Sequence, residues 1–585
     1  MNIYDYDILK QLSKENYTSQ RILSENTGYS LGKVNEAIHH LLEEGLIDKD
    51  ARLTSKGDTE INKNKPQNAI ILAAGFGMRM VPINAEIPKG LLEVRGEVLI
   101  ERLIRQLQAV GIDEITIVVG FLKEKYEYLI DQFNVKLVYN PDYALKNNLH
   151  SLYLVREELE NTYVLPSDIW LEENPFSKTE CYSWYLVTEI MDEESTVRIN
   201  RQRELTSIKL GQGGNTMIGV SYLTKNKTNE VKDRLTLFSQ NNKYDDVFWE
   251  EALFSGHSHE PTYGKIYLSD KVMEINTYEQ LRELDSDSIH LNTQIIHLIS
   301  DVLKVKTDEV VEISVLKKGM TNRSFKFSVN GHSYIMRIPG EGTDQLIDRR
   351  QEYEVYEQLK GHSISDDVIY MSPENGYKIT KFVENSDVCN PYNLDDVRQS
   401  MKKLRDFHDK KLIVNHTFDL FGKIHFYESL WEGKPSVFKD YLETKDKVLE
   451  LKEVIEKLPK EFVLTHIDAV PDNFLFAEDE IRIIDWEYAG MQDPHLDIAM
   501  FAIYSLYEKE QVDTLIDSYF EEGCTEEIRM KIYCYIAISG LLWSNWCEYK
   551  RFCGVEFGEY SLRQYHYAKE YYNILKKMNR FKELI

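Results

Sequence analysis

The stretch AIILAAGFGMR, residues 69–79, joins an uninterrupted apolar run to a glycine-rich turn that ends in a base. This pattern predicts a buried β-strand followed by a tight loop. Glycine lets backbone N–H groups come close to phosphate oxygens, and the loop leads toward a helix N-terminus, which favours anions. A lysine follows within PKGLL at residues 88–92. We therefore expect a triphosphate-binding site in which both cations also act catalytically, formed by Ala74, Gly75, Gly77, Arg79 and Lys89.

Strands and helices alternate along the segment that follows this loop. Residues 99–110 have an amphipathic helical pattern, and residues 114–119 and 163–165 are short apolar runs typical of strands. Such alternation predicts a Rossmann-like α/β domain with helices on both faces of its sheet, which we place at residues 67–288. Asp168 follows the last of these strands, at the sheet edge where ligands bind. Because its carboxylate suits Mg²⁺, we expect a metal ligand there.

This segment resembles the sugar-nucleotidyltransferase-like superfamily and, within it, the bacterial phosphocholine cytidylyltransferases. Besides the loop, the matching stretches are VVGFL at 118–122, NNLHSLYLV at 147–155 and DVFW at 246–249. The resemblance implies a mixed sheet, CTP and phosphocholine as substrates, and Mg²⁺ at Asp168. It also implies a second metal ligand where the family usually has Glu-Ile-Asp and this chain has Glu-Ile-Asn. Asn276 can still offer a carbonyl oxygen to the metal, without the charge.

A phosphocholine headgroup is expected to bind against aromatic faces, because its trimethylammonium group is attracted to π-systems. Trp249 is our candidate for this role in the transferase, with Trp184 and Tyr185 as further candidates. For each of the three, a place in the hydrophobic core is an equal alternative.

A second chemical pattern lies in the C-terminal half, where HIDAVPDN occupies residues 466–473 and IDWE follows at 484–487. Phosphoryl transfer needs a carboxylate that orients the attacking hydroxyl, and an amide with a second carboxylate that hold Mg²⁺ on the phosphates. Asp468 fits the first role as the catalytic residue, and Asn473 and Asp485 fit the second. His466 is expected to orient the loop rather than to carry a proton.

Residues 289–585 resemble the choline and ethanolamine kinases, which implies a bilobal protein-kinase-like α+β domain that uses ATP. In KGMTNR, residues 318–323, Asn322 belongs to the loop that covers the nucleotide in that family. Arg337 stands where the family's phosphate-contacting strand usually has Lys, and Arg can also hold two phosphate oxygens. We expect Glu352 as its ion-pair partner, with Glu354 as a competitor.

The same resemblance covers WSNW at residues 543–546, whose two indoles lie on one face of a helix. Choline kinases box the quaternary ammonium with such a pair and nearby tyrosines. The implied choline-binding residues are Tyr488, Trp543, Trp546 and Tyr560. The alternative is that these aromatic side chains belong to the core.

The first 62 residues resemble a small winged helix-turn-helix domain. Helical patterns at 4–12, 19–25 and 30–44 precede an extended piece at 46–53, for which we expect a β-hairpin. The polar segment 62–66 then predicts a linker. These first 62 residues contain more acids than bases, with a net charge of −4, which opposes phosphate binding. We therefore expect a packing, dimerisation or regulatory role rather than DNA binding.

The composition of the chain limits its partners. The 585 residues carry a formal net charge of −27, which argues against nucleic acid as a partner. An apolar stretch of about 20 residues, as a membrane span requires, is not present in the sequence. The N-terminal heptapeptide MNIYDYD is acidic where a signal peptide carries bases, so we expect a cytoplasmic protein.

Both patterns together predict a bifunctional enzyme that makes CDP-choline with Mg²⁺ at both sites. ATP phosphorylates choline to phosphocholine, and CTP then transfers its cytidylyl group to phosphocholine with release of pyrophosphate. Two alternatives stay open. The first is the same pair of reactions on ethanolamine or another amino alcohol. The second is a winged-helix transcriptional regulator whose other domains sense metabolites. A homodimer is also left open.

Overall fold

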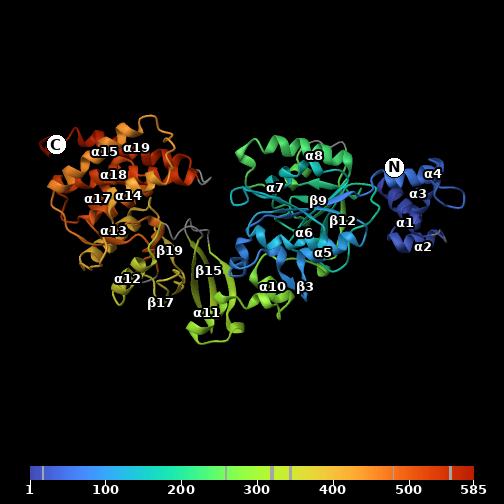
Figure 1. Cartoon of the computed structure of the whole chain (residues 1–585), viewed down its shortest axis with the longest axis horizontal. Coiled ribbons are helices and arrows are strands. Elements are labelled where there is room, and N and C mark those ends of the chain that lie inside the picture. The colour runs from blue at the N-terminus through green and yellow to red at the C-terminus, as the bar shows by residue number, and fades with distance from the viewer. Residues whose placement is uncertain are drawn as a thin grey trace. The chain divides into compact units, whose positions relative to one another are not determined.

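The computed structural model describes the chain except for residues 16, 18, 257–259, 317–321, 341–345, 478–479, 553–556 and 585. For residues 78, 85 and 322 it describes the backbone alone. The chain forms two compact units, residues 1–298 and 299–585, and α11 (Gln294–Leu303) contains the boundary between them (Figure 1). In the part of the chain that is described, no helix is long and apolar enough to cross a membrane.

The first unit begins with a helical module that confirms the winged helix-turn-helix prediction. Its helices are α1 (Ile3–Lys14), α2 (Gln20–Thr27), α3 (Leu31–Glu43) and α4 (Ser55–Lys63). The predicted hairpin is reduced to one bridge, between Ile47 and Leu53. We did not predict α4, although Thr54 is a good N-cap residue and its side chain accepts a hydrogen bond from the backbone of Gly57.

This module packs against the α/β domain of the same unit through polar contacts. Lys10 Nζ donates to Glu180 Oε2 at 2.7 Å, and the hydroxyl of Tyr182 donates to Asp7 at 2.6 Å. The side chain of Asn64 donates to the main chain of Cys181 at 2.8 Å. Because these contacts come from α1 and the end of α4, most of the surface of α3 stays exposed.

A seven-stranded mixed sheet forms the centre of the α/β domain, with strand order β12-β8-β11-β6-β1-β4-β5. The parallel part contains β6, β1, β4 and β5, while β11 runs antiparallel to β6 and to β8. The strand bounds are β1 (Asn68–Ala73), β4 (Glu114–Val119), β5 (Lys136–Tyr139), β6 (Thr162–Pro166), β8 (Trp184–Asp192), β11 (Gly214–Leu223) and β12 (Tyr263–Ile266).

Helices cover both faces of this sheet, as predicted. Alternate residues of β1 point to opposite faces, so Ile71 packs with α5 (Leu99–Gln108) and α6 (Tyr128–Phe133). Ile70 packs on the other face with α7 (Asn148–Leu154) and α8 (Lys225–Phe238) (Figure 1). Smaller elements complete the domain: β2 (Glu93–Val94), β3 (Glu97–Val98), β7 (Ile169–Leu171), β9 (Val197–Ile199), β10 (Leu205–Ser207), α9 (Glu250–Phe254), β13 (Val272–Glu274) and α10 (Tyr278–Leu284).

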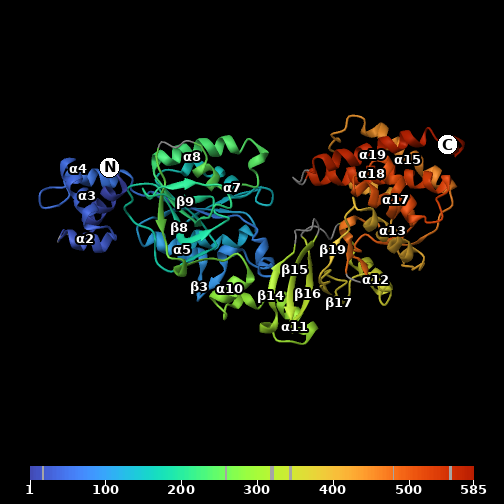
Figure 2. The same ribbon diagram turned by 180° about the vertical axis from the view of Figure 1, so that it is seen from behind.

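The second unit has the two lobes of a protein-kinase-like fold (Figure 2). Its small lobe is a five-stranded antiparallel sheet with the order β14-β15-β16-β18-β17, together with α12 (Arg349–Leu359). The strands are β14 (Val311–Val315), β15 (Asn322–Val329), β16 (His332–Pro339), β17 (Val368–Met371) and β18 (Lys378–Lys381).

The large lobe is mostly helical, and its helices pack around one hydrophobic core that α12 also joins. Its helices are α13 (Leu394–His408), α14 (Leu420–Ser429), α15 (Tyr441–Lys457), α16 (His495–Tyr504), α17 (Lys509–Tyr519), α18 (Glu526–Phe552), α19 (Glu559–Leu575) and α20 (Asn579–Leu584). Short strands lie beside them: β19 (Asp387–Val388), β20 (Val463–Thr465), β21 (Phe474–Phe476), β22 (Ile481–Ile483) and β23 (Gly490–Gln492).

Candidate active sites

The glycine-rich loop follows β1 directly, and its two glycines differ in what they require. Gly77 has a φ of +63°, and a Cβ built there would lie 2.9 Å from Cγ of Lys89. Gly75 has no atom within 4 Å of the corresponding position. Position 77 therefore requires glycine for two reasons: its backbone conformation is left-handed, and Lys89 approaches too closely for a side chain to fit. Arg79 follows with an exposed side chain.

Lys89 connects the residues that we predicted as metal ligands. Its ammonium donates to Asp168 Oδ2 at 3.0 Å and to Asn276 Oδ1 at 2.6 Å. Asp168 follows β6, Asn276 follows β13, and Lys89 begins a 3-10 turn at residues 89–91. Three segments that are distant in the sequence therefore bring the ammonium of Lys89 together with two side-chain oxygens.

Glu274 adds a carboxylate to this group. Burial raises its pKa, and the neighbouring charge of Asp168 raises it further, while the cations Lys89 and Arg79 oppose the shift. Arg79 is therefore close enough to act on the same site. Glu274, which we did not select as a site residue, therefore belongs to the same group of charges as Asp168 and Lys89.

An open aromatic face is not found at Trp249, Trp184 or Tyr185, contrary to our interpretation of them as headgroup-binding residues. Each is 1% exposed and packs in the core. The rings of Trp249 and Tyr185 contact each other with centroids 6.3 Å apart. The ring of Trp184 has Lys265 Nζ 4.3 Å from its centroid. The core alternative therefore holds for all three, because neighbouring side chains already cover their faces.

Sequence reasoning missed Glu250, which begins α9 beside this aromatic group. The hydroxyl of Tyr185 donates to Glu250 Oε1 at 2.9 Å. Oε2 is buried without a hydrogen-bond partner among the described residues. Burial raises the pKa of this carboxyl to about 7. In the sequence, Glu250 directly follows the apolar run of residues 247–249. An acid next to such a run is a signal, because burying a carboxylate costs free energy.

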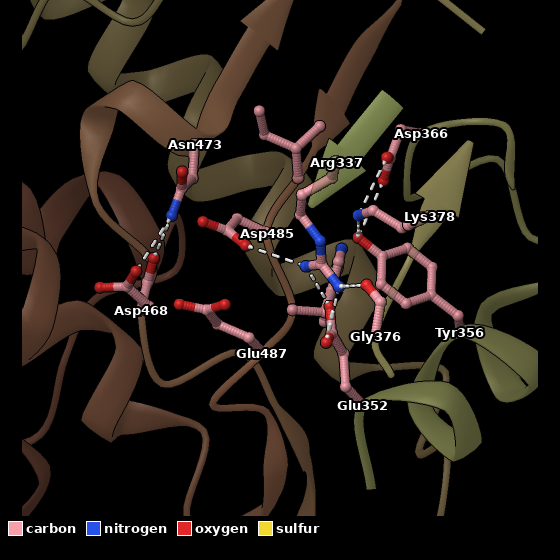
Figure 3. A network of polar contacts seen from close by, with 12 residues as sticks. Arg337, Glu352, Tyr356, Asp366, Gly376, Lys378, Asp468, Asn473, Asp485 and Glu487 are labelled. Atoms are coloured by element: carbon pink, nitrogen blue, oxygen red, sulfur yellow. Dashed lines mark hydrogen bonds and ion pairs between the residues drawn. The ribbon is translucent and has the colours of Figure 1, made fainter. Parts of the chain in front are cut away.

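The predicted catalytic residues of the kinase domain lie together between its lobes (Figure 3). Asn473 Nδ2 donates to the main-chain oxygen of Asp468 at 2.9 Å and to its Oδ2 at 3.3 Å. Asp485 lies 3.8 Å from Arg337 Nη1, measured from Oδ1. Asp485 and Ile467 both have a positive φ, +65° and +71°, which is unusual for residues other than glycine and typical of functional sites.

Asp497 and Glu487, which we did not predict as site residues, act on this loop. Asp497 accepts the backbone N–H groups of His466 and Ile467, at 2.9 and 2.7 Å. Burial raises the pKa of Asp468 to about 8, and the negative charges of Asp485 and Glu487 add to this shift. A bound cation would lower this pKa by stabilising the ionised carboxylate, so this cluster of acids suits a cationic ligand.

His466 has the orienting role that its sequence context suggested. Burial lowers the pKa of its imidazole to about 4, so the ring is neutral near pH 7. The ring Nε2 lies 2.9 Å from the main-chain oxygen of Ile484 and, as a donor, holds the loop against the strand that leads to Asp485.

Arg337 forms the ion pair that we predicted with Glu352. Its Nη1 and Nη2 donate to Oε1 and Oε2 of Glu352 at 2.5 and 2.9 Å, and both residues are buried. Glu354 instead lies 3.8 Å from His416. The side chain of Asn322, our predicted nucleotide contact, lies outside the described residues.

The four predicted choline-binding side chains belong to one aromatic cluster. Tyr488 contacts Trp543 edge to face at 6.2 Å, and Trp543 contacts Trp546 at 5.6 Å, both between ring centroids. Phe557 connects Trp546 to Tyr560, with centroid separations of 5.1 and 6.3 Å. Tyr504 also contacts Tyr560. We did not predict Phe557 and Tyr504, because single aromatic residues in a helical region have no distinguishing pattern.

Each candidate site offers a small set of side-chain oxygens to a metal ion. Among the described residues, no group of three or more His, Cys, Asp and Glu side chains could hold a metal ion alone. Each site pairs one carboxylate with one amide, Asp168 with Asn276 and Asp485 with Asn473. Mg²⁺ commonly binds through one or two carboxylates and completes its octahedron with water and phosphate oxygens. The donors present therefore fit magnesium on a triphosphate.

Comparison with known families assigns a domain to each of the three segments. The family model described as choline/ethanolamine kinase matches residues 313–567. The MobA-like NTP transferase domain matches residues 69–174, and the winged helix-turn-helix DNA-binding model matches residues 1–48.

Similar proteins each correspond to one part of the chain. The choline-phosphate cytidylyltransferase of Streptococcus pneumoniae is 31% identical over 220 residues, which are 37% of this chain and 96% of that protein. Protein LicA of Haemophilus influenzae is 28% identical over 261 residues, 42% of this chain and 76% of LicA. The crystal structure of choline kinase LicA from Streptococcus pneumoniae is 26% identical, with a TM-score of 0.43, and covers 48% of this chain and 98% of that one.

The two sequence relatives are matched over 96% and 76% of their own length, so whole domains, and not isolated motifs, are shared with this chain. The chain belongs to the choline-phosphate cytidylyltransferase family, and it combines that domain with a choline/ethanolamine kinase domain and an N-terminal winged helix-turn-helix domain.

Proposed function

We propose that this protein makes CDP-choline in two steps at two separate sites. The kinase domain transfers the γ-phosphoryl group of ATP to choline. The transferase domain then joins the phosphocholine to CMP from CTP and releases pyrophosphate. The observation that carries the proposal is the aromatic cluster beside Asp468, because it provides a cation-binding surface next to the residue that would activate a hydroxyl.

In the kinase reaction, the aromatic cluster holds the trimethylammonium group by cation–π attraction. The negative charge of Asp468 reaches the hydroxyls of Tyr488, Tyr504 and Tyr560, so the carboxylate lies close to this cluster. Asp468 accepts the proton of the choline hydroxyl as its oxygen attacks the γ-phosphorus of ATP, and the bond to the β-phosphate oxygen breaks.

The other polar residues of the kinase site position the nucleotide. Asn473 and Asp485 would hold Mg²⁺, which neutralises the negative charge that develops on the phosphate oxygens. Arg337 lies beside Asp485 with its guanidinium oriented by Glu352, and it faces the phosphates as a second positive charge.

In the transferase reaction, a phosphate oxygen of phosphocholine attacks the α-phosphorus of CTP and displaces pyrophosphate. The loop at Gly75 and Gly77 would receive the triphosphate, and Arg79 and Lys89 stabilise the charge that moves to the leaving group. Asp168 and Asn276 would hold Mg²⁺ on the triphosphate. Lys89 must then exchange its contacts with these two residues for contacts with phosphate oxygens.

Glu250 is our candidate for recognition of the headgroup in the transferase. Its Oε2 is buried and has no hydrogen-bond partner among the described residues. A buried carboxylate oxygen without a hydrogen-bond partner is costly, and a bound cation reduces that cost. The trimethylammonium group of phosphocholine has the required charge.

Purified protein with choline, ATP, CTP and Mg²⁺ is expected to yield CDP-choline and pyrophosphate. Asp468→Asn should reduce phosphocholine formation about a thousandfold, as expected for loss of a general base, and leave cytidylyl transfer from supplied phosphocholine intact. Asp168→Asn should do the reverse. Loss of both activities in either folded variant would contradict the assignment of separate sites.

Ethanolamine is the second candidate acceptor, because the matching kinase family includes enzymes for both alcohols. A primary ammonium prefers hydrogen bonds to carboxylates, whereas a quaternary ammonium has no N–H group and relies on aromatic faces. The aromatic cluster favours choline. Initial rates of ATP consumption with choline and with ethanolamine, each at limiting concentration, decide between them.

A further inference from the structure

Helix α12 contacts the sheet of the small lobe at two points, one helical turn apart. Arg337 of β16 and Lys378 of β18 are direct partners across the antiparallel strand pair, so their side chains leave the same face of the sheet. Glu352 and Tyr356 are four residues apart on α12 and face these two cations in order. Arg337 binds Glu352, and Lys378 Nζ donates to the hydroxyl of Tyr356 at 2.5 Å.

The second contact is a closed group of three polar side chains (Figure 3). The hydroxyl of Tyr356 donates to Asp366 Oδ1 at 3.1 Å, and Lys378 Nζ lies 3.4 Å from Asp366 Oδ2. The ammonium also lies 4.3 Å from the centroid of the Tyr356 ring. Lys378 and Tyr356 are each 6% exposed. Below, we call Lys378, Tyr356 and Asp366 the second anchor of α12.

Stability alone does not account for this anchor. Burying a lysine and an aspartate costs desolvation free energy, and apolar residues of similar volume often stabilise a protein as well or better. A network with fixed hydrogen-bond partners does specify one orientation of the elements that it connects, which apolar contacts specify less strictly. The elements connected here are β18, α12 and the segment that contains Asp366.

Arg337 depends on the orientation of α12. Both terminal nitrogens of its guanidinium donate to Glu352, and Nη2 also donates to the main-chain oxygen of Gly376 at 3.2 Å. Asp485 lies 3.8 Å from Nη1. A rotation of α12 about its axis would move Glu352, and the guanidinium would turn with it, away from Asp485 and the phosphates.

We propose that Lys378, Tyr356 and Asp366 are positioning residues for the nucleotide, because they fix α12 so that Glu352 directs Arg337 toward the phosphates. Tyr356 and Asp366 act through Arg337, whereas the charge of Lys378 also reaches Glu352 and Asp485 directly. This inference rests on the proposed kinase function and adds to it a set of residues outside the active-site motifs.

The test measures binding of the Mg²⁺ complex of a non-hydrolysable ATP analogue by calorimetry, in the full-length protein and without choline. Tyr356→Phe removes one hydroxyl and keeps the ring, and Lys378→Met removes the charge and keeps much of the length. Each is expected to raise the Kd of the nucleotide about tenfold, as for loss of a charge-assisted hydrogen bond. The KM for choline should stay within about twofold, because no choline contact changes. Lys378→Arg should recover most of the affinity.

Tyr572→Phe is the matched control for general loss of stability. The hydroxyl of this buried tyrosine donates to Glu450 at 2.8 Å, between α19 and α15 of the large lobe. It should lower the melting temperature as Tyr356→Phe does and leave the Kd of the nucleotide unchanged. An unchanged Kd in Tyr356→Phe and Lys378→Met, or an equal rise in Tyr572→Phe, would overturn the proposal. A wild type that binds the nucleotide but does not phosphorylate choline would overturn the proposed function alone, because this measurement does not depend on the alcohol.

Discussion

At the scale of single residues, the transferase site brings several polar and charged side chains together around Lys89. Lys89 holds the carboxylate of Asp168 and the amide of Asn276 at one point, although the amide is neutral. In the family that this segment resembles, Asp usually stands at this position. The neutral Asn276 therefore makes the site less negative here. Glu274 is next to it in space and supplies a carboxylate of raised pKa, due first to burial and then to Asp168.

Glu250 should give the transferase a pH dependence of substrate affinity. Burial raises its pKa from 4.5 to about 7, so the carboxyl loses its proton as the pH rises through that value. A cationic headgroup binds the ionised form better. The KM for phosphocholine in the wild type is therefore expected to fall as the pH rises from about 6 to about 8.

Glu250→Gln keeps the shape of the side chain and removes this titration. Its KM for phosphocholine should be raised about tenfold at pH 8 and should lack the part of the pH dependence that belongs to Glu250. The phosphate of phosphocholine also titrates in this range, but it does so equally for both proteins. Initial rates of CDP-choline formation from supplied phosphocholine measure the difference. Parallel pH profiles for wild type and variant would refute this role of Glu250.

At the scale of elements, the loop after β1 is shaped by one glycine more than by the other. Gly77→Ala would put a Cβ in a left-handed conformation and 2.9 Å from the side chain of Lys89. We expect the unfolding free energy of the first unit to fall by about 1–3 kcal/mol, because both the strain and the displaced lysine cost free energy. Urea unfolding, followed through the loss of CTP-dependent activity, measures this change.

Gly75→Ala is the matched control for that change in stability. A Cβ at Gly75 would have no atom within 4 Å, and the φ of this residue is not positive. Its substitution should alter the unfolding free energy by less than about 0.5 kcal/mol. Equal destabilisation by both substitutions would show that the close approach of Lys89 is not what requires glycine at position 77.

At the scale of the whole molecule, the N-terminal module is built into the transferase unit. Glu180 is buried and receives Lys10 from α1 at 2.7 Å, while the hydroxyl of Tyr163 lies 3.1 Å from its other oxygen. Tyr163 belongs to β6, the strand that leads to Asp168. The module therefore stabilises a buried charge next to the central sheet.

Lys10→Met should destabilise the first unit by about 3 kcal/mol, because it leaves the carboxylate of Glu180 buried without its cation. Cytidylyl transfer should then be lost at a lower temperature, while the kinase of the same chain keeps its thermal stability and serves as an internal reference. Lys33→Met is the matched control, since Lys33 pairs with Glu36 on the exposed surface of α3. Equal heat sensitivity of Lys10→Met and the wild type would contradict the structural role of the module.

The sequence by itself determined the parts of this protein whose chemistry is local. Particular residue types within a few positions characterise three parts of the chain, so a short pattern is enough to predict them. These parts are the strand and loop of residues 69–79, the loop of residues 466–473 and Asp485. The α/β fold of the transferase and the kinase-like fold follow from the order of the elements around those patterns, and the observed strands and helices confirm both.

Only the tertiary structure decided which side chains are buried and which distant residues meet. Lys89 contacts Asn276 across 187 positions, and Lys10 contacts Glu180 across 170. Trp249 lies in the core, whereas Trp543 joins an aromatic cluster beside Asp468, although neither residue type nor local pattern separates the two. The buried Oε2 of Glu250 and the second anchor of α12 could not be predicted for the same reason. Burial and partner choice depend on how remote segments pack, and a local pattern contains no information about that packing.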